Sequence, residues 1–120
     1  ALPLNVSGAF HTPLMADAAR DFARLVDAVP LNDPVIPVVG NVEARPLTSA
    51  AALRDELKRQ MTSPVLWRHS VSVMAEAGVT TFLETGPGRV LSGLISRTVA
   101  EADARSLDAP IAAVPNSRHA

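Results

Sequence analysis

The feature that most constrains the fold is an alternation of helical and extended patterns with little chain between them. Thr12 and Pro13 form a helix N-cap and a first-turn proline, and the apolar residues after them recur at helical spacing. Val35–Val39 and Val79–Leu83 are short runs of β-forming residues, and we expect the first to be a buried strand. This alternation favours the α/β class, with a layered, largely parallel sheet and flanking helices.

Further helices are predicted after the first. Ser49 can cap a second helix, which has one polar residue on its apolar stripe. The stripe consists of Leu53, Leu57, Gln60 and Met61. Ser63 and Pro64 repeat the cap-and-proline signature before a third helix that ends at Gly78. A fourth helix, which carries Leu91, Leu94, Ile95 and Val99, follows a glycine-rich turn. The segment GPGRVLSG, residues 86–93, lacks the spacing of a nucleotide-binding loop, and we expect Gly86 and Gly88 in tight turns and Gly93 in close helix packing.

The composition argues against several classes of partner. Eleven basic and twelve acidic residues give a net charge of -1 without a block of like charge, so neither a nucleic acid nor a membrane is an expected partner. There is no cysteine, and the three histidines share no ligand spacing, so no metal site is predicted. No apolar run approaches the ~20 residues that span a bilayer.

His11 is the first candidate for chemistry. It lies between the extended run Leu2–Val6 and the helix that follows Thr12, where active groups collect in parallel α/β sheets. A neutral imidazole there is a competent general base, and a surface loop histidine is the plain alternative. If Gln60 lies nearby, its side chain or its carbonyl could accept from one ring nitrogen and leave the other free; otherwise Gln60 is a structural group bonded to backbone.

The chain offers this base no obvious nucleophile. None of its serines stands in a G-x-S-x-G elbow. His69 is expected on a helix surface and His119 in a tail. The sequence starts at Ala1 within an extended pattern and without an initiator methionine, so we expect an N-terminal part of the same protein to be missing. Ile111–Val114 is predicted as a last short strand.

Three segments carry a resemblance to a known family. They are VSGAFHTPLM (6–15), VIPVVGNVEARPLT (35–48) and LKRQMTSPVLWRHSVSVMAEAGVTTFLETGPGRVLSGLISR (57–97). In this order and spacing, over about residues 1–98, they resemble the C-terminal part of malonyl-CoA:acyl carrier protein transacylases. The resemblance implies an α/β-hydrolase-like large subdomain with an inserted ferredoxin-like small one. Residues 1–6 would then end a strand of the small subdomain, 7–114 would belong to the large one, and 115–120 would form a tail.

The resemblance also implies roles for individual residues. His11 matches the catalytic histidine, and Gln60 matches the glutamine whose main-chain carbonyl orients it. Asn41 falls in the family's NV turn beside the site, and Phe10 matches a position where a bulky ring favours malonyl over branched units. The reaction would be ping-pong transfer of malonyl from malonyl-CoA to the phosphopantetheine thiol of acyl carrier protein, in fatty acid biosynthesis and in the cytoplasm. No cofactor is implied, because the coenzyme A and phosphopantetheine thioesters are substrates.

The nucleophilic serine, part of the oxyanion hole and the arginine that grips the malonyl carboxylate lie, in that family, in segments that this chain does not contain. We therefore expect the chain to be inactive by itself. Two alternatives stay open. One is the acyltransferase domain of a polyketide or multifunctional fatty acid synthase, and the other is a non-catalytic α/β binding module in which His11 and Gln60 satisfy each other's hydrogen bonds.

Overall fold

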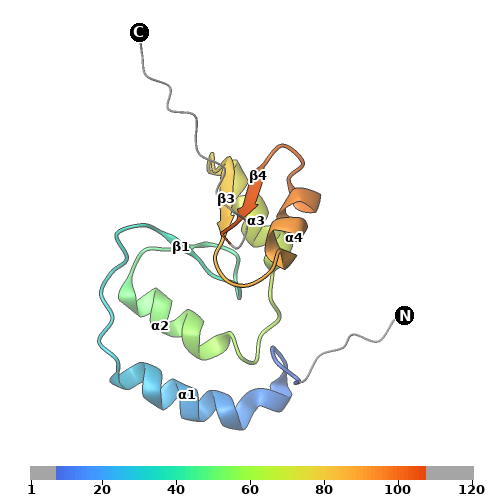
Figure 1. Cartoon of the computed structure of the whole chain (residues 1–120). Coiled ribbons are helices and arrows are strands. Elements are labelled where there is room, and N and C mark those ends of the chain that lie inside the picture. The colour runs from blue at the N-terminus through green and yellow to red at the C-terminus, as the bar shows by residue number, and fades with distance from the viewer. Residues whose placement is uncertain (1–7, 108–120) are drawn as a thin grey trace. The chain divides into compact units, whose positions relative to one another are not determined.

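The computed structural model describes residues 8–107 and divides the chain into two compact units, 1–73 and 74–120 (Figure 1). The first unit holds the 3-10 turn η1 (Pro13–Met15), helix α1 (Ala16–Ala28), strands β1 (Val38–Val39) and β2 (Pro46–Leu47), and helix α2 (Ala50–Arg59). Helix α3 (Trp67–Glu76) runs from the first unit into the second. The second unit continues with β3 (Thr81–Glu84), α4 (Val90–Thr98) and β4 (Asp103–Ser106).

The first helix begins where the sequence predicts it. The Thr12 hydroxyl accepts the N–H of Leu14 at 3.3 Å, and Pro13 occupies the first turn, which is 3-10 before the chain continues as α1. Helix α1 packs on α2 (Figure 1) and buries Val26. The Arg54 guanidinium of α2 donates to the Val29 carbonyl at 2.9 Å and to the carbonyl of Val26, so it satisfies carbonyls that the end of α1 leaves free.

The predicted strand Val35–Val39 is wrong in length and burial. Only Val38 and Val39 pair with another strand, while Val35 and Ile36 are 101% and 78% exposed. The prolines at positions 34 and 37 explain this, because they lack the N–H that a sheet ladder requires. The partner strand β2, antiparallel with Val38 opposite Leu47, was not predicted because it has two residues and starts with proline.

Helix α2 begins as predicted and α3 begins later. The Ser49 hydroxyl accepts the N–H of Ala52 at 3.2 Å, which caps α2. The helix ends at Arg59, so Gln60 is its C-cap rather than a residue within the helix. Helix α3 starts at Trp67, after the Ser63–Pro64 signature.

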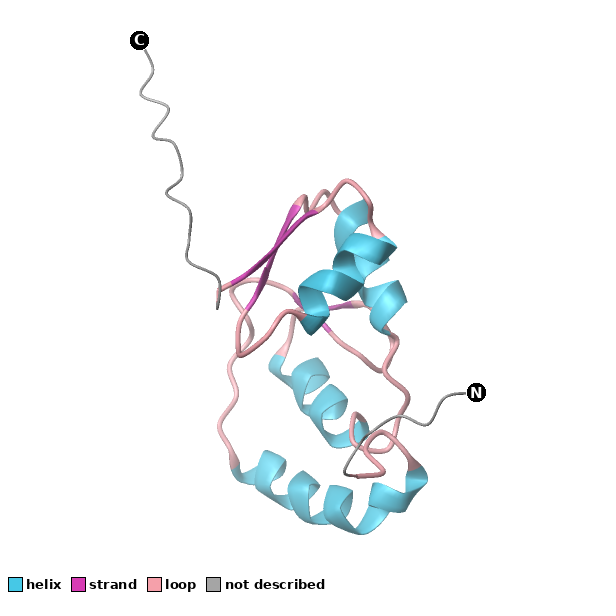
Figure 2. Cartoon of the chain, turned by 45° about the vertical axis from the view of Figure 1, so that its right-hand side comes forward, coloured by secondary structure: helices cyan, strands magenta, loops and turns pink. Residues whose placement is uncertain are grey.

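In the second unit a helix joins two parallel strands. Gly78, with φ +92°, closes α3: its N–H donates to the Ala75 carbonyl and that of Val79 to the Met74 carbonyl, as in a Schellman motif. Strand β3 then pairs in parallel with β4, with Phe82 opposite Ala104. Helix α4 lies against these strands (Figure 2) and buries Ile95. The β3–α4–β4 order shows the expected α/β character, although β4 was not predicted.

Several expectations reach beyond these observations. In the described residues the strands form two separate pairs, one antiparallel and one parallel, and the hydrolase-like layering stays a prediction. The same holds for the division into subdomains at 1–6, 7–114 and 115–120. The strands predicted at Leu2–Val6 and Ile111–Val114 lie outside the described residues. Within 8–107, no helix has the length and apolarity needed to cross a membrane.

Candidate functional site

His11 lies in the turn before η1, and its ring is held by one hydrogen bond. Its Nδ1 is 2.7 Å from the main-chain oxygen of Gln60, 49 residues away along the chain. A carbonyl oxygen only accepts hydrogen bonds, so Nδ1 carries the proton in this contact. In a neutral ring the lone pair is then on Nε2. The side chain is exposed, so Nε2 can receive a proton from a group that approaches this surface.

The backbone of His11 is unusual. Its φ of +62° lies in the left-handed region, where histidine is tolerated better than most residues with a β-carbon. Backbone strain of this kind is concentrated at functional sites in proteins. The next residue, Thr12, ties the turn together because its hydroxyl donates to the Ala9 carbonyl at 2.7 Å. The imidazole is therefore placed by a turn that is fixed on both sides.

The carbonyl that holds His11 is available because α2 ends there. The last carbonyls of a helix have no partner within the helix, and Gln60 is the C-cap of α2. The structure thus brings together the two residues that the sequence singled out, through the backbone of Gln60 rather than its side chain. The Gln60 side chain lines a pocket of about 220 Å³ between α2 and the β1–β2 hairpin.

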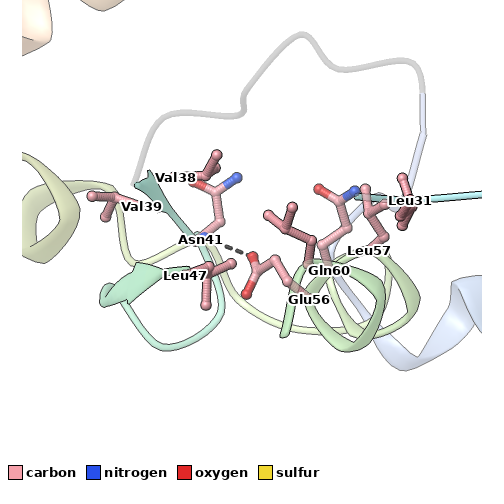
Figure 3. Close-up of a pocket in the computed structure, with 10 residues that line it drawn as sticks. Leu31, Val38, Val39, Asn41, Leu47, Glu56, Leu57 and Gln60 are labelled. Carbon is pink, nitrogen blue, oxygen red and sulfur yellow. Dashed lines mark hydrogen bonds between the residues drawn. The ribbon is translucent and has the colours of Figure 1, made fainter. Parts of the chain in front are cut away.

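Asn41 lines the same pocket from the opposite wall, in the turn between β1 and β2 (Figure 3). Its backbone N–H donates to Oε1 of Glu56 at 2.6 Å, and its carbonyl accepts the N–H of Leu66 at 2.9 Å. No hydrogen bond joins Asn41 to His11 in the described part of the chain. The orienting role of Asn41 stays a prediction.

Glu56 is the residue that sequence reasoning missed. It lies on α2, four residues before Gln60, and its Oε1 accepts the N–H groups of both Asn41 and Val42, the second at 3.0 Å. The spacing of four was a usable signal, because residues i and i+4 lie on one face of a helix. A glutamate on a polar helix nevertheless resembles an ordinary surface residue, and its partners are 14 and 15 positions away.

Phe10 precedes His11, and the residue is 60% exposed. It lies over the backbone of Gly8, where an added β-carbon would be 2.7 Å from the ring Cε2. Phe10 is thus next to the candidate base in the chain, and most of its surface is open to solvent.

The N–H groups that follow the glycine-rich turn of the second unit donate hydrogen bonds to a side chain of the same unit. Oxygens of the Glu84 carboxylate accept the N–H of Leu91 at 3.0 Å and both the N–H and the hydroxyl of Ser92 at 2.8 Å. The Ser92 N–H contributes most to a pKa of Glu84 below its usual value, and the other two donors act in the same direction. The first amides of α4 are therefore already occupied, which agrees with the expectation that this segment is no phosphate loop.

The other expectations concern glycines and histidines. Gly86 and Gly88 have φ of +124° and +93°, as tight turns require. Close packing at Gly93 is not found, since nothing within the described residues lies within 4 Å of a β-carbon built there. His69 is exposed on α3, as predicted, and His119 lies outside the described residues. Between residues 8 and 107, no three His, Cys, Asp or Glu side chains gather as metal ligands would.

Comparison with known proteins gives a consistent result. No protein-family model matches the chain. A malonyl CoA-acyl carrier protein transacylase from Synechocystis is 39% identical over 107 residues, which cover 89% of this chain and 36% of the relative. The protein of the same name from Escherichia coli is 44% identical over 112 residues, covering 93% of this chain and 36% of the relative. A polyketide biosynthesis malonyl CoA-acyl carrier protein transacylase from Bacillus subtilis is 42% identical over 103 residues, covering 86% and 35%.

Solved structures agree with the sequence relatives. The crystal structure of the Synechocystis transacylase superposes with a TM-score of 0.82 at 39% identity, over 89% of this chain and 38% of the other. That of the Xanthomonas oryzae transacylase gives 0.83 at 45% identity, over 89% and 34%. A malonyl-transacylase in complex with a type II polyketide acyl carrier protein gives 0.83 at 40% identity, over 91% and 35%. The chain spans about a third of the length of these relatives, and over most of its own length it is homologous to malonyl CoA-acyl carrier protein transacylases.

Proposed function

We propose that this chain forms part of an enzyme that transfers a malonyl group from malonyl-CoA to the phosphopantetheine thiol of acyl carrier protein. The observation that carries the proposal is the hydrogen bond from His11 Nδ1 to the Gln60 carbonyl, because it leaves Nε2 as a proton acceptor. The homology to transacylases supplies the reaction. The nucleophilic serine and the groups that bind the malonyl carboxylate belong to polypeptide outside these 120 residues.

In this reaction, the role of the chain is to provide a positioned general base, His11. Nε2 of His11 takes the proton of the serine hydroxyl as its oxygen attacks the thioester carbonyl. When the carbon–sulfur bond breaks, the imidazolium returns that proton to the departing coenzyme A thiolate, and malonyl stays on the serine as an ester. In the second half His11 takes the proton of the phosphopantetheine thiol, whose sulfur attacks the ester, and the serine oxygen recovers the proton.

The surface of the first unit supports the need for further polypeptide. Several large apolar side chains near the candidate site are exposed, among them Leu14 at 83% and Phe10 at 60%. Exposed apolar surface of this kind is typical of surfaces that contact other protein. We propose that the missing part of the enzyme covers this surface, and that the 120-residue chain is inactive alone.

Two finer points belong to the same proposal. The enzyme would need no cofactor beyond its thioester substrates and would work in the cytoplasm. Phe10, exposed beside His11, would restrict the acyl group to malonyl, so Phe10→Ser in the complete enzyme should raise the use of methylmalonyl-CoA relative to malonyl-CoA. An unchanged ratio would remove Phe10 from the account of specificity.

A second point is which acyl carrier protein accepts the malonyl group. Transacylases of fatty acid and of polyketide synthesis share the part of the sequence present here, as the Bacillus subtilis polyketide relative shows. We propose fatty acid synthesis as the primary role, since the similar transacylases from Synechocystis and Escherichia coli carry no polyketide designation. Comparing transfer rates to carrier proteins of the two pathways would decide between them.

The test is malonyl transfer by the complete protein that contains this chain, with three proteins compared. His11→Asn removes the base and keeps a residue that tolerates left-handed backbone. His69→Asn makes the same exchange at an exposed histidine of α3 and is the matched control. We expect the wild type and His69→Asn to transfer malonyl to acyl carrier protein at similar rates, and His11→Asn to be about 10²- to 10⁴-fold slower. An inert wild type, or a His11→Asn variant at the wild-type rate, would refute the proposal.

A further inference from the structure

Helix α2 contacts the candidate site at two points, one turn apart. At its C-terminal end the Gln60 carbonyl holds the ring of His11 at 2.7 Å. One turn earlier, the Glu56 carboxylate accepts hydrogen bonds from the turn that contains Asn41. Its Oε1 is 2.6 Å from the N–H nitrogen of Asn41 (Figure 3) and 3.0 Å from that of Val42. A single rigid element therefore fixes both walls of the pocket that Asn41 and Gln60 line.

The turn is built to receive this carboxylate. A β-carbon at Gly40 would lie 2.6 Å from Glu56 Oε2 and 2.8 Å from its Cδ, so only glycine leaves room for the carboxylate in this position. Gly40 is itself buried, and its φ is not in the left-handed region, so space rather than backbone conformation explains the glycine. Gly40 and Glu56 are thus complementary in shape.

Glu56 is also the partner of the turn's N–H groups. The carbonyls of the turn are satisfied from another side, since Leu66 donates to Asn41 O at 2.9 Å and the Ser70 hydroxyl to Gly40 O at 3.2 Å. Without the carboxylate, the half-buried N–H groups of Asn41 and Val42 lose their acceptor while the carbonyl contacts stay. Hydrogen bonds from N–H groups to an ionised carboxylate are stronger than those to neutral acceptors. Their loss would leave the turn attached to α2 only through the exposed ion pair between Glu43 and Arg59.

We propose that Glu56 is a positioning residue for the transacylase site, which holds the Asn41 turn in register with the His11–Gln60 pair, and that Gly40 is the residue that admits its carboxylate. The catalytic part of this inference rests on the proposed function. Displacements of about 1 Å at an active site can slow a reaction by about 10²-fold, so loss of this brace is expected to slow catalysis without touching the base itself.

The neighbouring acid, Asp55, provides a matched control. It lies on the same helix but is exposed, and its carboxylate pairs with Arg59 at 3.0 Å on the surface. Asp55→Ala removes one negative charge from α2, as Glu56→Ala does, and leaves in place both the acceptor of the Asn41 and Val42 N–H groups and the ion pair of Arg59 with Glu43. Glu56→Gln removes the charge but keeps an oxygen that can accept from both N–H groups.

The first measurement is kcat for malonyl transfer by the complete protein. We expect Glu56→Ala to lower kcat about 10-fold, Glu56→Gln to recover most of that loss, and Asp55→Ala to match the wild type. In an Asn41→Ala background, Glu56→Ala should cost little more, because both changes act through the same turn. The inference would be overturned if Glu56→Gln did not recover the loss of kcat seen in Glu56→Ala. It would also be overturned if the losses of kcat from Glu56→Ala and Asn41→Ala multiplied in full in the double variant.

The second measurement does not depend on activity. Amide hydrogen exchange at Asn41 and Val42 should become at least about 10-fold faster in Glu56→Ala and stay unchanged in Asp55→Ala, because local opening governs exchange. Unchanged exchange at these two amides in Glu56→Ala would overturn the positioning role even in an active enzyme. If the wild type transfers no malonyl, the proposed function fails, and faster exchange in Glu56→Ala would still support the brace.

Discussion

Replacing Gly40 by alanine tests the shape complementarity between the hairpin turn and α2. The new methyl carbon would lie 2.6 Å from Glu56 Oε2 and 3.1 Å from Cδ1 of Leu47. Carbon and oxygen in ordinary contact are more than 3 Å apart, so the carboxylate must move. It would then lose its contacts with the N–H groups of Asn41 and Val42.

The expected cost can be built from these parts. Overpacking a filled site costs about 1–3 kcal/mol, and each buried N–H left without a partner costs about 1–3 kcal/mol. Because the turn is only half-buried and water can replace part of the loss, we expect Gly40→Ala to lower the free energy of unfolding by about 2–4 kcal/mol. In a Glu56→Ala background the carboxylate is absent, and the remaining contact is with the flexible end of Leu47. The same change should then cost less than about 1 kcal/mol, since alanine also restricts the unfolded chain.

Urea unfolding of the chain, followed by the fluorescence of its single tryptophan, Trp67, measures all four proteins of this cycle. A coupling of at least about 1 kcal/mol between positions 40 and 56 is expected. Equal costs of Gly40→Ala in the two backgrounds would refute the reasoning, because they would show that the methyl group and the carboxylate do not compete for the same space.

Three further predictions concern local stability. Gly78→Ala should lower the free energy of unfolding by about 1 kcal/mol because φ is +92° there, and an unchanged or raised value in urea unfolding would contradict this. Gly93→Ala, inside α4 with no neighbour within 4 Å in the described residues, should raise it by about 0.5–1 kcal/mol, and a lowered value would contradict that. Ser49→Ala should cost about 1 kcal/mol through loss of the cap of α2, and an unchanged unfolding midpoint would contradict this role. The lowered pKa of Glu84 means that its contribution to stability is fully present above its usual pKa and is lost as pH falls below that value; Glu84→Gln should make unfolding less pH-dependent in that acidic range, and an identical pH profile would contradict the assignment.

Local signals in the sequence predicted most helix boundaries because short-range chemistry determines them. The hydroxyls of Thr12 and Ser49 cap helices, as their positions indicated, and Gly78 ends α3 in a left-handed conformation. Strands were harder to predict. Strand β2 has two residues and β4 is mostly polar, and both depend on a partner strand that local composition does not reveal.

The residues of the candidate site also differ in how far the sequence predicted them. Its position at a junction singled out His11, and residue chemistry alone left open whether Gln60 is its partner. The resemblance to transacylases pointed to the Gln60 carbonyl, and the structure shows that contact at 2.7 Å. The spacing of four residues placed Glu56 on the same helix face as Gln60, but it did not reveal the role of Glu56, which depends on the fold bringing a turn 15 residues upstream against α2. The spacing of apolar residues does not reveal a polar side chain whose role is to hold backbone N–H groups.

The central claim is that the Gln60 carbonyl fixes the His11 ring with its proton on Nδ1, so that Nε2 is free to act as the base. Nitrogen-15 NMR of the histidine rings, at a pH where His11 is neutral, measures this directly. The account predicts a protonated Nδ1 and an unprotonated Nε2 at His11. A ring whose proton is on Nε2, or one that exchanges freely between the two tautomers, would contradict it.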